Sequence, residues 1–244
     1  MSNIATAVVE AAEQFPTRLA VQDEERALTY AELDELSARA AGGLLAHGVG
    51  RGDRVGLRLP HAAAFAVLCF GALRAGAVVV PLFPQTRKEV TRPGGDAFGA
   101  EIVFARPDAT RKQDSDADAG DDTMSVLAGP DFLEQVAFWP QRHGVADRTG
   151  HTTAVMAPGQ GTTASGQEPA VLSHRSLRDS ARTVRLLSGL AATHDGRVEP
   201  ERASCPTSRT YGMQAVLLTG ACLPACLLTG RGPGGTVSRS GSSE

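Results

Sequence analysis

The hydrophobic positions near the start of the chain change between helical and alternating spacing. Residues 4–15 carry apolar side chains every three or four positions, which predicts an amphipathic helix. Short segments at 19–22 and 26–28 lie on either side of acidic residues and could pair as a β-hairpin. Helical spacing returns at 33–44, and Gly48 is a natural end for that helix.

The next segment alternates between strand and helix patterns. Residues 55–59 alternate apolar side chains with Gly56 and Arg58, as in a half-buried strand. A helix is expected from 62 to 74, and the apolar run at 77–80 is typical of a parallel strand covered on both faces. Strand, helix and strand in this order predict a right-handed parallel crossover and an α/β fold.

The middle of the chain has weaker patterns. A helix at 87–97 is interrupted by proline and glycine, and 101–105 is expected to be a strand. Residues 106–123 are rich in aspartate and poor in apolar side chains, so we expect a solvated, disordered and easily cleaved linker. A calcium loop is the alternative, because DSDADAGDD has closely spaced carboxylates, but the glycine is misplaced and no bidentate glutamate follows.

After the acidic linker, ordered structure is expected to begin again near Asp131. Strands are predicted at 153–157 and 170–172, and helices at about 175–188 and at 211–218. The sequence therefore divides into a first α/β segment, an acidic linker with a weakly structured stretch, a segment with candidate chemistry, and a Gly/Ser-rich disordered tail, at 1–105, 106–149, 150–228 and 229–244.

Composition narrows the choice of partners. The chain has 244 residues, of which 42% are hydrophobic and 21% charged, and the formal net charge is -3. Scattered Lys and Arg and few aromatic residues argue against a nucleic-acid partner. No apolar stretch approaches the roughly 20 residues of a membrane span, and the N-terminus lacks a secretory pattern, so a cytoplasmic location is expected. The cysteines lack CxxC spacing and are interpreted as small buried thiols rather than metal ligands: Cys69, Cys205, Cys222 and Cys226.

Several segments, taken in order, carry a family resemblance. LTYAELDELSARAAGGLLAHGVGRGDRVGLRLP at 28–60 and LRAGAVVVPLFP at 73–84 resemble the opening of AMP-forming acyl-CoA synthetases and related adenylate-forming enzymes. AVLSHRSL at 170–177 is similar to the stretch that follows the phosphate loop of that family. TYGMQAVLLTG at 210–220 is similar to a motif beside the acyl pocket. The resemblance implies part of an N-terminal adenylating domain, with layered sheets and flanking helices.

The resemblance also implies a reaction. Family members adenylate a carboxylic acid, such as a fatty acid, with ATP and Mg²⁺, and then form a thioester with coenzyme A. In their phosphate loop, small residues let backbone N–H groups approach the phosphates. Gly161, Thr162 and Thr163 match that loop, whereas Ala164 occupies a glycine position and Glu168 stands where a lysine is expected. We therefore expect nucleotide contacts from the three matching residues and weak or absent ligase activity.

Other candidate residues lie later in the chain. The resemblance makes Tyr211 and Gly212 candidates for the acyl pocket. Arg209 is either a ligand for a carboxylate or phosphate or a solvated surface residue. His174 is interpreted as a capping or packing residue, with acid–base chemistry as the alternative. No catalytic residue or metal ligand is assigned.

The later family segments, including the magnesium-binding segment and the small domain with a catalytic lysine, find no match after Gly220. The sequence therefore predicts a fragmentary form of the enzyme. Three interpretations remain open: a nucleotide-binding remnant, a non-catalytic interaction module whose protein partner covers the incomplete sheet, and a decayed or mis-framed gene product.

Overall fold

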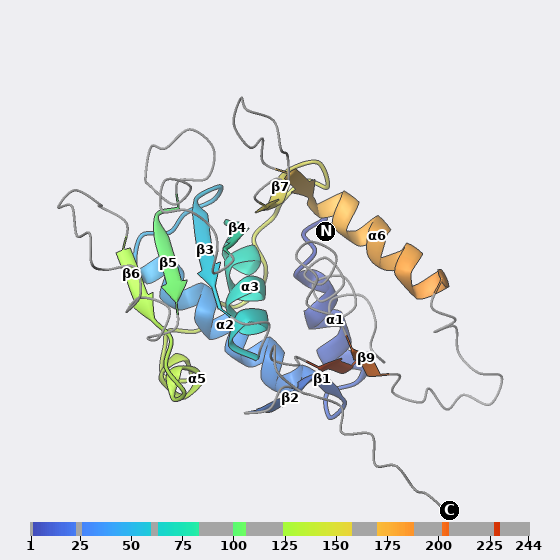
Figure 1. Ribbon diagram of the computed structural model, residues 1–244, viewed down its shortest axis with the longest axis horizontal. Helices are drawn as coiled ribbons and strands as arrows, with labels where there is room; N and C mark the ends of the chain where they lie inside the picture. The colour runs from blue at the N-terminus through green and yellow to red at the C-terminus, as the bar shows by residue number, and fades with distance from the viewer. Residues whose placement is uncertain are drawn as a thin grey trace, which may run out of the picture.

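The computed structural model describes most of the first half of the chain and shorter stretches of the second. The described residues are 2–22, 26–59, 63–82, 100–105, 124–157, 170–187, 202–204 and 227–229. They form an α/β fold with two sheets and flanking helices (Figure 1). The predicted helices at 87–97 and 211–218 and the predicted linker at 106–123 lie outside the described residues.

Helices and strands alternate along most of this part of the chain. The helices are α1 (Thr6–Gln14), α2 (Tyr30–Ala46), α3 (Ala63–Ala75), α5 (Phe132–Val136) and α6 (His174–Leu187). The strands are β1 (Leu19–Gln22), β2 (Ala27–Thr29), β3 (Arg54–Arg58), β4 (Val78–Pro81), β5 (Ile102–Ala105), β6 (Met124–Leu127), β7 (Thr153–Ala157), β8 (Ala170–Ser173), β9 (Arg202–Ser204) and β10 (Leu227–Thr229). Most agree with the predicted elements within a few residues, but β6 begins before Asp131, where order was expected to return.

The larger sheet has six strands in the order β6-β5-β3-β4-β7-β8. Every neighbouring pair from β6 to β7 is parallel, and β8 runs antiparallel to β7. β4 is buried along its whole length, which confirms the prediction from its apolar run. The carboxyl ends of five strands therefore lie along one edge of this sheet.

The smaller sheet has the order β2-β1-β10-β9. The antiparallel pairing of β1 with β2 confirms the predicted hairpin. β10 pairs in parallel with β1, and β9 pairs in parallel with β10. No strand was predicted at β9, and β10 runs one residue into the segment at 229–244 that was predicted to be a disordered tail.

Helix α2 begins with a capping box formed by Thr29 and Glu32. The backbone N–H of Glu32 donates to Thr29 Oγ1 at 3.3 Å, and the N–H of Thr29 donates to Glu32 Oε2 at 2.8 Å. The hydrogen bond from the Thr29 backbone is the main cause that lowers the pKa of Glu32. Two otherwise unpaired N–H groups are satisfied at the helix start, which defines where α2 begins.

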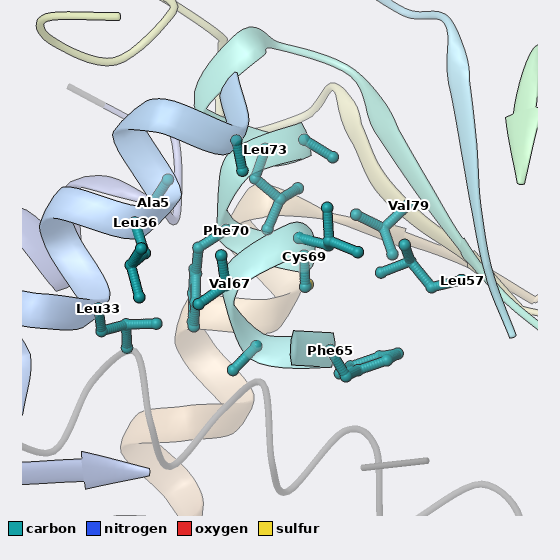
Figure 2. Close-up of a cluster of buried hydrophobic side chains, with 14 of the residues drawn as sticks. Ala5, Leu33, Leu36, Leu57, Phe65, Val67, Cys69, Phe70, Leu73 and Val79 are labelled. Atoms are coloured by element: carbon teal, nitrogen blue, oxygen red, sulfur yellow. The ribbon is translucent and has the colours of Figure 1, made fainter. Parts of the chain in front are cut away.

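The main core lies between the larger sheet and helices α2 and α3. Figure 2 shows Leu33 and Leu36 of α2 beside Phe70 of α3, with Leu57 and Val79 of the sheet on the other side of α3. All five side chains are buried. Apart from Arg74, helix α3 is apolar around its circumference, as expected for a helix that packs against both a helix and a sheet.

Gly71 permits the close approach of α3 to α2. A Cβ atom at this position would lie 2.6 Å from the Cβ of Ala40 and 3.2 Å from the backbone nitrogen of Ala41. Helix propensity alone would make Gly71→Ala stabilising by about 1 kcal/mol. We expect the opposite sign, a loss of about 1–2 kcal/mol in the free energy of unfolding, because neither helix can move without disturbing the core. Urea unfolding measures the change, and a stabilised variant would contradict the packing described here.

Candidate functional site

The segment 158–169, which holds Gly161, Thr162 and Thr163, connects β7 to β8. Ala157, the last residue of β7, pairs with Ala170, the first residue of β8. The two ends of the segment are therefore held next to each other by the sheet. The three residues themselves, and Glu168, lie outside the described residues.

The position of this connection in the sheet favours ligand binding. The chain passes from β4 to β5 on one side, across β3, whereas it passes from β7 to β8 on the other side. β4 and β7 are parallel neighbours, with Val79 opposite Val155. Neighbouring parallel strands whose connections leave in opposite directions form a switch point, and open α/β sheets bind their ligands at the carboxyl ends of strands there.

His174 lies near the amino end of β7, whereas 158–169 follows its carboxyl end. Ser173, the residue before it, pairs with Thr153 at the amino end of β7. The backbone N–H of His174 donates to Thr152 O at 3.2 Å, and its Nδ1 accepts the N–H of Ile4 at 3.2 Å. The ring is fully buried, so its place at the first residue of α6 supports packing between α6 and the N-terminal segment rather than acid–base chemistry beside the loop.

Electrostatics support the same role for His174. Burial is the main cause that lowers the pKa of the imidazole to about 4, and the positive charges of Arg148 and Arg178 lower it further. The ring is therefore neutral at pH 7. Because Nδ1 accepts a hydrogen bond, the proton resides on Nε2.

The candidate acyl-pocket residues Tyr211 and Gly212 lie outside the described residues, and so does Arg209. The nearest described elements in the sequence are β9 and β10, which belong to the smaller sheet. The roles of these three residues stay predictions.

Arg58 lies at the edge from which 158–169 departs, and no role was assigned to it from the sequence. It is the last residue of β3, and it pairs with Ala105, the last residue of β5. The side chain is partly buried, and this burial lowers the pKa of the guanidinium. The only sequence signal was an arginine within the apolar strand pattern VGLRLP.

Within the part of the chain that the structure describes, no group of three or more His, Cys, Asp or Glu side chains could hold a metal ion. None of the helices described has both the length and the apolar character needed to cross a membrane. Cys69 is buried within α3, in agreement with the interpretation of this cysteine as a small buried thiol, and burial raises the pKa of its thiol.

The family model of AMP-binding enzymes matches residues 8–224. The chain belongs to the AMP-binding enzyme family. This confirms the resemblance read from the sequence. The match spans the first α/β segment from residue 8 onward, both strands beside 158–169, and the candidate residues near 211.

Relatives of this chain include both acyl-CoA ligases and other ligases named for an AMP product. It is 45% identical over 87 residues to the salicyl-AMP ligase / salicyl-S-ArCP synthetase of Mycobacterium tuberculosis, covering 34% of this chain and 15% of the relative. It is 28% identical over 210 residues to the medium-chain fatty-acid–CoA ligase of Escherichia coli, covering 80% of this chain and 34% of the relative.

Solved structures show the same fold. A long-chain-fatty-acid-CoA ligase from Archaeoglobus fulgidus aligns with a TM-score of 0.74 at 16% identity, covering 93% of this chain and 47% of that one. A fatty acyl CoA synthetase of Mycobacterium tuberculosis aligns with a TM-score of 0.69 at 22% identity, covering 94% and 45%. The chain thus spans about half the length of these structures.

Proposed function

We propose that this chain binds ATP at 158–169 and takes part in the adenylation of a carboxylic acid. The observation that carries the proposal is the pairing of Ala157 with Ala170. This pair holds the two residues that flank the GTT segment next to each other, at a switch point of the sheet. The relatives named as salicyl-AMP and fatty-acid–CoA ligases support a carboxylic acid as substrate. Mg²⁺ and coenzyme A are proposed as co-reactants on the same grounds.

The residues of the segment suit a polyphosphate in part. Gly161 has no side chain to block approach to its backbone N–H, and Thr162 and Thr163 add hydroxyl donors. Bound ATP would supply the activated phosphorus that the carboxylate attacks. For the substrate we propose Tyr211 and Gly212 in the acyl pocket and Arg209 as a ligand for its carboxylate. We also propose that residues 105, 149 and 228 are the boundaries between the first α/β segment, the acidic linker with its weakly structured stretch, the segment with the nucleotide and acyl sites, and the tail.

Glu168 is the feature that opposes this function. A carboxylate beside the phosphates repels them where a lysine would attract them. We therefore propose weak ligase activity, with pyrophosphate release slower than about 1 per second on fatty and aromatic acids. Turnover at or above that rate would contradict the assigned effect of Glu168.

A non-catalytic interaction module is the second candidate. It is favoured by the edge strand β6, where Met124 is 48% and Leu127 is 53% exposed. A protein partner that added a strand beside β6 would lie next to these two side chains, which project from opposite faces of the sheet.

A thermal-unfolding assay separates the two candidate functions. Saturable stabilisation of the protein by Mg·ATP favours nucleotide binding, and an unchanged unfolding midpoint at millimolar ATP favours the interaction module.

Glu168→Lys is expected to tighten ATP binding by about 1–3 kcal/mol, because it removes a repulsion and adds an attraction. The gain is expected to shrink as salt rises, since screening weakens both contributions. Calorimetric titration at low and high salt measures it. Glu134→Lys, an exposed residue of α5, makes the same charge change in another element and is the matched control. Equal tightening in both variants would show a non-specific charge effect and overturn the assignment.

A further inference from the structure

Arg58 ends strand β3, at the same side of the sheet as the carboxyl end of β7, from which 158–169 continues. The face of the sheet on which Arg58 lies follows from its neighbours in β3. Val55 and Leu57 of β3 belong to the core with α3, whereas a Cβ at Gly56 would lie 2.9 Å from the Cγ2 of Val103 and 3.0 Å from the Cδ1 of Leu82, on the other face. Side chains two positions apart in a strand share a face, so Arg58 lies on the face of Gly56.

The same face leads to the start of the candidate nucleotide segment. Met156 of β7 packs against the small cluster formed by Val80, Leu82, Ala100 and Val103. It therefore shares the face of Gly56 and Arg58, and 158–169 begins directly after Ala157. Only β4 separates β3 from β7, which places the two strands roughly 10 Å apart. An extended arginine side chain can bridge much of such a gap.

The chemistry of Arg58 suits a phosphate. A guanidinium stays charged in proteins, and it offers paired N–H donors that match the oxygens of a phosphate. Partial burial strengthens its attraction for an anion, because the interaction is less screened than in bulk water. The segment 158–169 has Glu168 in place of a lysine, so a cation supplied by another strand would offset that loss.

We propose that Arg58 binds a phosphate group of a nucleotide at this edge, from either ATP or coenzyme A. The inference rests on the proposed function, because it adds a residue to the same site. Arg58 acts as a binding residue, and it contributes affinity without taking part in bond making. Both candidate ligands present phosphates attached to adenosine, and separate titrations identify the source.

Calorimetric titration of the full chain with Mg·ATP, and separately with coenzyme A, tests the proposal. Arg58→Gln is expected to weaken binding of at least one of them about tenfold or more, since a charge-assisted hydrogen bond is lost. Arg58→Lys keeps the charge and should recover part of the loss. Arg54→Gln is the matched control, because Arg54 lies on the same strand and face but at the amino end, roughly 13 Å away. It should bind both ligands like the parent.

The outcomes separate this inference from the proposed function. Loss with ATP alone assigns Arg58 to the ATP phosphates, and loss with coenzyme A alone assigns it to the phosphates of that cosubstrate. Unchanged affinity of Arg58→Gln for both ligands overturns the inference and leaves the proposed function intact. No binding of either ligand by the parent overturns both. Circular dichroism and the unfolding midpoint establish that each variant is folded, and a misfolded Arg58→Gln is replaced by the comparison of Arg58→Lys with the parent.

Discussion

Arg74→Met is expected to lower the free energy of unfolding by about 3 kcal/mol, because it removes a buried guanidinium that is paired with the partly exposed Asp34 and hydrogen-bonded to three further oxygens. Arg74 of α3 is 4% exposed. Its guanidinium donates to Asp34 Oδ1 at 2.7 Å, to Asp34 O and Ser37 Oγ at 2.8 Å, and to Gly144 O at 3.3 Å. Methionine fills a similar volume but leaves the carboxylate and the carbonyl oxygens without these donors.

Arg39→Met is the control for that prediction. Arg39 of α2 pairs with Glu35 one helical turn away, in a partly exposed setting, at 3.0 Å. This exposed pair contributes about 0.3–0.5 kcal/mol, and the hydrogen bond from Arg39 to Trp139 O at 3.2 Å adds about 1 kcal/mol, so the total stays well below the loss expected at Arg74. Urea denaturation of both variants measures the difference, and equal losses would mean that Arg74 does not hold α3 to α2.

Stability is expected to fall as the pH decreases from about 6.5 to 4, by up to about 3 kcal/mol from His174 alone. The folded pKa of His174 is lowered to about 4, mainly by burial, whereas the unfolded chain takes up the proton near pH 6.5. The unfolded state therefore binds more protons within this window. The contribution of this neutral buried imidazole is complete above pH 6.5 and is lost as the pH falls to 4.

His174→Gln isolates this effect from the other titrating groups. The variant is less stable at pH 7, because the hydrogen bond from the N–H of Ile4 and the packing of the ring change. Its free energy of unfolding should nevertheless depend less on pH between 6.5 and 4 than that of the parent. Parallel pH profiles from chemical denaturation would contradict the assignment to His174.

The elements with strong hydrophobic patterns could be predicted from the sequence. The apolar strand β4 and helix α3, which is apolar apart from Arg74, agree with their predicted ranges within a few residues, because burial on both sides requires such patterns. β9 (Arg202–Ser204) has only three residues and was missed, since its pairing with β10 supplies what its own sequence does not. The buried polar contacts were missed as well. Asn3 donates to Leu73 O at 2.8 Å and to Ala146 O at 3.0 Å across long sequence separations.

The candidate site could be predicted only as a segment. GTT at 161–163 and its flanking strings indicated a phosphate loop, but the strand order was needed to place that loop at a switch point. The position of Arg58 could not be predicted from the sequence. An arginine in an alternating strand is usually a solvent-facing residue, and only the register with Ala105 shows that it lies at the carboxyl edge.

Amide hydrogen exchange with and without Mg·ATP shows whether ATP binds at 158–169. Backbone N–H groups that donate to phosphates exchange more slowly. Saturating nucleotide should therefore slow exchange in peptides that cover 158–169, with little change in α2 and in α5 on the distant β6 side of the sheet. Unchanged exchange across 158–169 at saturating ATP, or protection confined to other segments, would mean that ATP does not bind there.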